Sequence, residues 1–281
     1  MSDAVSDSVF VADGDGFVPT VNARGPWDPQ ALHGGAPAAL MAAAFERLEP
    51  GSELRIARLG FEFLRPIPLA PLSLSTQIVR PGRRVQELAG ELRSGEQLVL
   101  RASALRVQEV PTGLPEPPPP PAPPARSADD AERPADGQAQ MPGPEAGTAV
   151  RFALDDNDWA SFAATAIEMR SLGDPRLPGP GQAWMRLRLP LLPGHTPTPL
   201  ARLAATADFG NGISAALPFE RFLFINADLT IHLQRPPRGE WIGLDARTLL
   251  HAGGTGLAES VLHDRHGPVG RAFQTLVVEP R

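Results

Sequence analysis

Two changes in the spacing of apolar side chains divide the first part of the chain into elements. From Pro37 to Leu48 apolar residues recur three and four positions apart, which is typical of an amphipathic helix. The spacing then falls to two, which indicates strands separated by turns that contain Pro or Gly. Four strands are expected at residues 54–64, 72–80, 85–93 and 98–107. Before the helix, Val9 to Val21 predicts one or two short strands.

The same order of elements returns later in the chain. Strands are expected at 167–172 and 182–189, a helix from Pro199 to Gly210, and four more strands at 222–233, 242–251, 255–263 and 269–278. A constant offset of 170 residues places Leu64–Pro66 (LRP) on Gln234–Pro236 (QRP) and Arg101 on Arg271. We interpret this as an internal duplication. Each copy, a helix followed by an antiparallel meander, predicts an α+β fold with the helix laid on the sheet.

Between the copies the composition changes abruptly. From about Val110 to Gly147 the chain has almost no large apolar residue and begins with a run of prolines, which is typical of a semi-rigid spacer. The predicted organisation is an N-terminal repeat (1–109), a Pro-rich linker (110–150) and a C-terminal repeat (151–281). A ligand for a proline-recognition module is the other interpretation of the spacer.

Asp208 is the residue that the second helix pattern leaves unexplained. Its stripe at helical spacing consists of Leu200, Leu203, Ala204, Ala207, Asp208 and Asn211. Burying a carboxylate on the core-facing side of a helix costs several kcal/mol unless hydrogen-bonding or charged partners surround it. Asp208 is therefore the first candidate for chemistry.

Composition excludes several classes of function. The net charge of −6 argues against nucleic acid as the main partner, because phosphate binding needs a basic surface. The absence of cysteine excludes disulfides, thiolate metal sites and a cysteine nucleophile. The histidines show no metal-ligand spacing, and no cofactor motif is present, so neither a metal nor a cofactor is expected. With no signal peptide and no span of about 20 apolar residues, a soluble cytoplasmic protein is expected.

Four segments together carry a family resemblance. They are RGPWDPQALHGGAPAAL at 24–40, TPLARLAATADFGNGIS at 198–214, FINADLTIHLQRPPRGEWIGLDA at 224–246 and GPVGRAFQTLVV at 267–278. The chain resembles the thioesterase-like superfamily, specifically the type II acyl-CoA thioesterases. The resemblance implies a double hotdog fold, in which two tandem repeats each wrap a long helix in an antiparallel sheet. It also implies hydrolysis of an acyl-CoA or related acyl thioester by an activated water, without an acyl-enzyme.

The resemblance also implies which residues do the chemistry. The family's catalytic carboxylate falls on Asp208, and its glutamine falls on Gln274. The third polar residue, commonly Thr or Ser, is Asn226 here, which can hold a water but cannot be a nucleophile. Strict alternation turns Asn226 away from the face that holds Leu229, so it reaches the site only if the strand bends or bulges nearby. Otherwise Asn226 is a turn residue.

The start of the first helix offers a further candidate group. Gly34 and Gly35 leave backbone amides that can hold a developing oxyanion, although a tight turn alone would also explain them. His33 is expected to be structural or a wall of the substrate pocket. Trp27 and Phe45 are expected to line an acyl pocket or to belong to the core. At the offset of 170, Ala104 lies where the second copy has Gln274, which indicates one active site per pair of repeats.

Two alternatives to a hydrolase remain. A hydratase or dehydratase on the same fold would pair His33 with a carboxylate, and a non-catalytic acyl-CoA-binding protein would explain the departure at Asn226. The resemblance further implies a homodimer or larger homo-oligomer.

Overall fold

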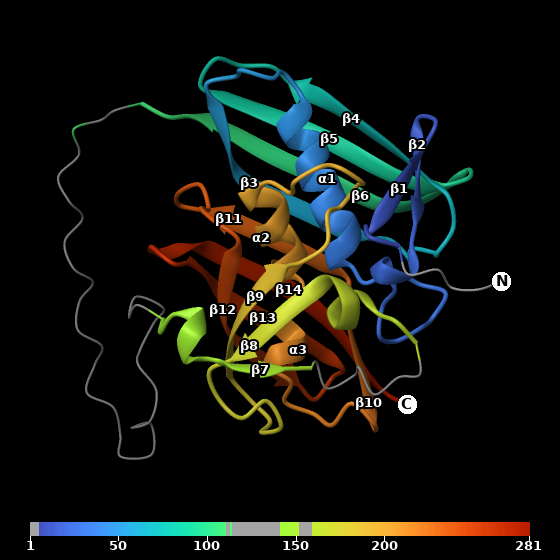
Figure 1. Ribbon diagram of the computed structural model, residues 1–281, viewed down its shortest axis with the longest axis vertical. Coiled ribbons are helices and arrows are strands. Elements are labelled where there is room, and N and C mark those ends of the chain that lie inside the picture. Colours follow the sequence, from blue (N-terminus) through green and yellow to red (C-terminus); the bar gives the residue numbers. More distant parts are fainter. Residues whose placement is uncertain (1–5, 111–112, 114–140, 152–158) are drawn as a thin grey trace.

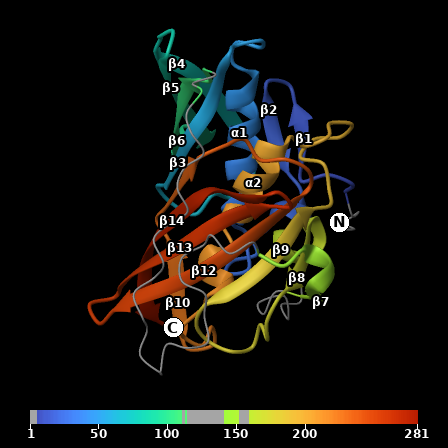
Figure 2. The same ribbon diagram turned by 90° about the vertical axis from the view of Figure 1, so that its left-hand side faces the viewer.

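The computed structural model describes residues 6–110, 113, 141–151 and 159–281. The proline tract of the expected linker, and with it the two interpretations of that tract, lies outside the described residues. Figures 1 and 2 show a strongly curved sheet that holds the two main helices on one side.

The described strands of both halves form one antiparallel sheet of 14 strands. In the first half they are β1 (Phe10–Asp13), β2 (Gly16–Pro19), β3 (Leu54–Phe63), β4 (Leu72–Arg80), β5 (Val85–Ser94) and β6 (Gln97–Gln108). In the second half they are β7 (Thr148–Val150), β8 (Ile167–Ser171), β9 (Gly181–Leu187), β10 (Phe222–Asn226), β11 (Asp228–Leu233), β12 (Trp241–His251), β13 (Thr255–Asp264) and β14 (Gly267–Pro280). The halves join where β3 pairs with β11. This is the expected α+β double hotdog.

Helices α1 (Gly35–Arg47) and α2 (Pro199–Ala207) pack against each other in the concavity of the sheet (Figure 1). They run antiparallel. A β-carbon at Gly35, in the first turn of α1, would collide with the carbonyl oxygen of Ala205 in the last turn of α2. At the other end Thr198, the N-cap of α2, donates a hydrogen bond to Glu46. The first turn of each helix therefore lies beside the last turn of the other.

Both helices are buried, which explains their content of small residues. Every residue of α2 from Leu200 to Ala207 is buried, so this helix lacks a solvent-facing side. The carbonyl oxygens of Phe45 and Leu48 at the end of α1 accept hydrogen bonds from the guanidinium of Arg106. A cation at this position satisfies carbonyl groups that have no partner inside the helix.

The duplication extends to the irregularities of the sheet. β5 and β13 begin 170 residues apart and have a register shift at equivalent places, Leu92/Arg93 and Leu262/His263. β3 shifts register around Ala57, and the equivalent Ala227 interrupts the strand between β10 and β11. Two copies of one ancestral unit explain bulges that recur at matching positions, since bulges are retained as structural features.

Three differences from the sequence expectation are local. The second helix ends at Ala207 rather than Gly210, and a short helix α3 (Gly210–Ile213) follows it. A one-turn π-helix, η4 (Phe162–Ala166), precedes β8. Within the range expected to be linker, Met141 is buried and β7 pairs with β8, so this part of the chain packs with the second half. No described helix is long and apolar enough to span a membrane.

Candidate active site

Asp208 follows the last residue of α2 and is buried, with 5% of its surface exposed. Its Oδ1 accepts a hydrogen bond from Asn226 Nδ2 at 2.9 Å and a longer one from Gln274 Nε2 at 3.3 Å. Its Oδ2 lies 3.0 Å from Nδ1 of His33. Both oxygens of this carboxylate therefore have polar partners, which is the condition that the sequence set for a carboxylate on the apolar stripe.

Gln274, on β14, is 1% exposed, and both its side-chain oxygen and its side-chain nitrogen have local partners. Its Oε1 accepts the backbone N–H of Asn211 at 3.0 Å, and its Nε2 donates to the backbone oxygen of Asp208 at 3.1 Å as well as to Oδ1. Gly210 makes this possible, because a β-carbon there would lie 2.8 Å from Gln274 Oε1. This arrangement makes Gln274 a residue that orients the carboxylate.

Asn226 reaches Asp208 because the strand is interrupted directly after it. Phe224 is buried, Ile225 is 45% exposed, and the bend at Ala227 then returns Leu229 to the core. The amide nitrogen of Asn226 donates to Asp208, and its Oδ1 makes no hydrogen bond to any residue that the structure describes. The condition that the sequence set for Asn226, a bent strand, is met.

His33 lies two residues before the start of α1 and contacts Asp208, a contact with a carboxylate that only the hydratase or dehydratase alternative required. Its ring stacks on Phe209 at 4.4 Å between centroids and lies 5.3 Å from Phe162. Its Nδ1 is also 3.0 Å from the backbone nitrogen of Gly35. The only sequence signal for this contact was the position of His33 beside two glycines.

Gly34 lies against the carboxylate, where its missing side chain matters. A β-carbon on Gly34 would be 2.8 Å from Asp208 Oδ2 and 3.0 Å from Phe63 Cζ. The N–H of Gly34 has no hydrogen-bond acceptor among the described residues, whereas that of Gly35 is directed to His33. The structure thus brings together the six residues that the sequence nominated for catalysis and for the oxyanion site.

Of the two aromatic residues nominated for an acyl pocket, only Trp27 lies near the site. Trp27 meets Phe224 edge-on with 5.8 Å between centroids, and Phe224 is two residues before Asn226. Phe45 is fully buried in the last turns of α1, far from Gly34, and belongs to the core.

The first half has a counterpart of this site without its amides. Glu46 lies near the end of α1 and accepts a hydrogen bond from Thr198 at the start of α2. Asp208 has the corresponding position in the second half, after the end of α2 and beside the start of α1. Burial raises the pKa of the Glu46 carboxyl, against the opposing effects of Thr198 and Arg106. The offset of 170 puts buried Ala104 and Ile56 where the second half has Gln274 and Asn226.

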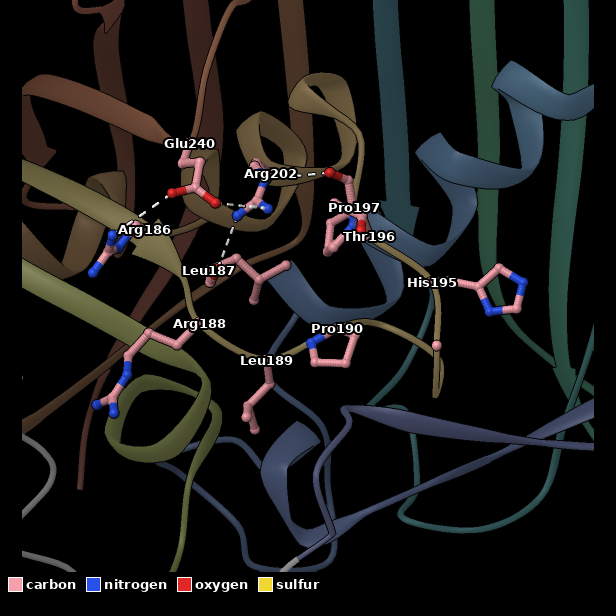
Figure 3. A pocket seen from close by; sticks show the side chains of 11 residues that line it. Arg186, Leu187, Arg188, Leu189, Pro190, His195, Thr196, Pro197, Arg202 and Glu240 are labelled. Carbon is pink, nitrogen blue, oxygen red and sulfur yellow. Dashed lines mark hydrogen bonds and ion pairs between the residues drawn. The ribbon is translucent and has the colours of Figure 1, made fainter.

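Two described cavities lie elsewhere. One of about 570 Å³ is next to the first turns of α2, where Figure 3 shows the Glu240 carboxylate between the guanidinium groups of Arg186 and Arg202. Six residues of helix, about 9 Å, separate Arg202 from Asp208. The other cavity, of about 920 Å³, adjoins Glu49 beyond the end of α1. Among the described residues no cluster of His, Asp or Glu is placed to hold a metal.

Comparison with protein families agrees with this fold. Residues 23–107 match the acyl-CoA thioesterase N-terminal domain, and residues 111–278 match the acyl-CoA thioesterase C-terminal domain. The chain belongs to the acyl-CoA thioesterase family, and it is a thioester hydrolase. Among curated protein sequences there is no significant match.

Solved structures share the fold over the whole chain. Acyl-CoA thioesterase II TesB2 from Mycobacterium marinum is 15% identical, with a TM-score of 0.62 and coverage of 89% of this chain and 90% of that one. A protein from Novosphingobium aromaticivorans, provisionally described as a thioesterase, is 20% identical, with a TM-score of 0.67 and coverage of 96% and 98%. A hot dog fold protein from Alicyclobacillus acidocaldarius is 16% identical, with a TM-score of 0.66 and coverage of 100% and 98%. At these identities the likeness concerns the fold.

Proposed function

We propose that the chain hydrolyses an acyl-CoA or a related acyl thioester with a water molecule activated by Asp208. The observation that carries this proposal is the carboxylate of Asp208, which is 5% exposed and has Oδ1 held by two amides from two different strands. The two amides hold the carboxylate in a fixed orientation, as a general base that removes a proton from a bound water requires.

The attacking water needs acceptors for its two hydrogens, and the site supplies two. Asp208 accepts the proton that is transferred, and Oδ1 of Asn226 is the acceptor for the other hydrogen. A carbonyl oxygen serves this purpose as a Thr or Ser hydroxyl would, which accounts for the departure at this position. Both N–H groups of Gln274 Nε2 are directed to Asp208, so Gln274 has no donor left for the water and orients Asp208 instead.

The reaction then follows from the positions of the donors. The water oxygen attacks the thioester carbonyl carbon while Asp208 takes its proton, and the N–H of Gly34 stabilises the oxyanion. Collapse of the tetrahedral intermediate breaks the carbon–sulfur bond, and the leaving thiolate receives the proton from Asp208. The products are the carboxylic acid and the free thiol.

The groups around Asp208 favour direct attack by water over an acyl-enzyme. The described side chains that bond to its carboxylate are two amides and an imidazole, so no described hydroxyl is hydrogen-bonded to the base as an activated nucleophile would be. Hydrolysis in ¹⁸O-labelled water distinguishes the two routes. Direct attack labels the acid product in the first turnover and leaves the mass of the protein unchanged throughout, whereas a covalent route through Asp208 adds the acyl mass to the protein during turnover and transfers ¹⁸O to it when water attacks the Asp208 carbonyl.

A second part of the proposal is one active site per chain. The counterpart in the first half has Ala104 and Ile56 in place of the two amides, so Glu46 has no amide from either position to orient it or to hold a water. Titration with a slowly hydrolysed acyl-CoA analogue is expected to saturate at one equivalent per chain, and two equivalents would contradict this.

The test of the proposed function is release of free thiol from acyl-CoAs of graded chain length. Asp208→Asn is expected to lower kcat by about 10²- to 10⁴-fold, the usual contribution of a general base. Glu46→Gln, which alters the equivalent carboxylate of the other half, is the matched control and is expected to retain the rate. Equal rates for Asp208→Asn and the unaltered protein would remove Asp208 from the mechanism.

One observation favours a second candidate. His33 and a carboxylate do converge, with 3.0 Å between Nδ1 and Oδ2, as a hydratase or dehydratase of this fold would require. The same assay decides between them, because a hydratase consumes an enoyl-CoA without releasing thiol. Family membership favours thioester hydrolysis.

A further inference from the structure

His33 is fixed more rigidly than a residue of a pocket wall needs to be. Its backbone N–H donates to the carbonyl oxygen of Ala23 at 2.9 Å, and its ring is enclosed by Phe209 and Phe162 with 9% of the residue exposed. The ring therefore presents one nitrogen, Nδ1, to the carboxylate of Asp208 in a defined orientation.

That nitrogen has two partners with opposite requirements. The N–H of Gly35 lies 3.0 Å from Nδ1 and can only donate, so this bond needs an unprotonated Nδ1. The ionised carboxylate of Asp208, also 3.0 Å away, can only accept, so that bond needs a hydrogen on Nδ1. A single ring nitrogen satisfies one of these partners at a time.

The charge on Asp208 decides which partner is satisfied. While Asp208 is ionised, an unprotonated Nδ1 would place its lone pair against a carboxylate in a poorly solvated site, which is unfavourable. The hydrogen then belongs on Nδ1, and the N–H of Gly35 loses its acceptor. This N–H becomes available next to that of Gly34, which has no acceptor among the described residues.

We propose that His33 is a positioning residue that couples the ionised state of Asp208 to the release of the Gly35 amide as a second oxyanion donor. This inference rests on the proposed function. The base and the additional oxyanion donor then become available in the same protonation state. The coupling explains why an imidazole, rather than an amide, occupies the third position around the carboxylate.

The tautomer of His33 is measured directly by ¹⁵N–¹H correlation in full-length protein labelled with ¹⁵N-histidine. We expect the hydrogen on Nδ1, the tautomer that free histidine disfavours, with the signal assigned from its loss in His33→Asn. In Asp208→Ala the hydrogen is expected to move to Nε2, and the Gly35 amide resonance to shift as it bonds to Nδ1. An unprotonated Nδ1 in the unaltered protein would overturn the proposal.

Kinetics supply the second readout. His33→Leu is expected to lower kcat about 10- to 100-fold with KM little changed, as for loss of a hydrogen bond to a charged group. His33→Asn, whose amide can donate to Asp208 without titrating, is expected to recover part of the rate. His251→Leu removes the same kind of bond, from the N–H of Gly253 to Nδ1, at an exposed turn, and is expected to stay within about threefold of the unaltered protein.

The two readouts separate this inference from the proposed function. A wild-type kcat in folded His33→Leu would overturn the coupling while leaving Asp208 as the base. If no acyl thioester is hydrolysed, the proposed function fails, and the tautomer still decides whether His33 donates to Asp208.

Discussion

The close approach between Gly34 and the carboxylate of Asp208 gives the sharpest structural prediction. Gly34 has φ −58° and ψ −29°, the right-handed helical region that alanine adopts without strain. Its β-carbon, however, would lie 2.8 Å from Asp208 Oδ2 and 3.2 Å from Oδ1. In Gly34→Ala the backbone can keep its conformation, but the new β-carbon collides with the carboxylate of Asp208.

The displacement can be worked out from these distances. Ordinary van der Waals contact with a β-carbon begins near 3.4 Å, so the carboxylate must recede by about 0.6 Å. A shift of this size along the bond from Asn226 Nδ2 to Oδ1 lengthens it from 2.9 Å to about 3.5 Å, outside the useful range. Loss of a hydrogen bond to a charged group costs about 1.5–3 kcal/mol, a factor of about 10 to 150 in rate.

We therefore expect kcat/KM of Gly34→Ala to fall at least about 10-fold in the thiol-release assay, with a melting temperature within a few degrees of the unaltered protein. Gly173→Ala is the matched control, because a β-carbon there meets nothing within 4 Å. A folded Gly34→Ala protein with unaltered kcat/KM would show that the position of the Asp208 carboxylate does not limit the reaction.

Other variants test the remaining parts of the account. Gln274→Leu leaves the N–H of Asn211 without its acceptor and Asp208 without an orienting amide, so kcat/KM is expected to fall at least about 10-fold. Burial raises the pKa of Glu46, so the stability that its neutral form contributes is lost as pH rises through the folded pKa. Glu46→Gln is therefore expected to raise the melting temperature at neutral pH, and this gain is expected to disappear in acid. Burial alone would raise the pKa of Asp264, but hydrogen bonds from Arg235 and from backbone N–H groups hold it below its usual value. Asp264→Asn is expected to lower the melting temperature at neutral pH, by an amount that shrinks as pH falls through the folded pKa, and a constant difference would contradict this. Homodimer formation stays a prediction, and a strictly monomeric mass in solution would contradict it.

Much of the fold could be predicted because the apolar period changes at the element boundaries. The β4 range of 72–80 and the constant offset of 170 between the halves both appear in the sequence and in the structure. The short strand β7 was missed because its three residues, Thr148–Val150, carry no alternation and adjoin the proline-rich tract. The end of the second helix was placed too late because the stripe continues through Asn211, although the backbone starts a separate helix at Gly210.

The site was only partly visible in the sequence, for a physical reason. A buried acid is recognisable in the sequence as a polar residue on an apolar stripe, so Asp208 could be found from spacing alone. Partner choice depends on where distant segments meet, and neither the contact of His33 with Asp208 nor the backbone bond from Asn211 to Gln274 leaves a periodic signal. Asn226 stood between these cases, because the sequence defined the strand break that it needed but could not establish that the break occurs.

The central claim is that the carboxylate of residue 208 takes a proton from the attacking water. Single-turnover thiol release by Asp208→Asn, compared with Glu46→Gln at equal protein concentration and saturating acyl-CoA, tests it most directly. The account predicts a rate about 10² to 10⁴ times lower for Asp208→Asn and an unchanged rate for Glu46→Gln. Equal single-turnover rates for the two variants would contradict it.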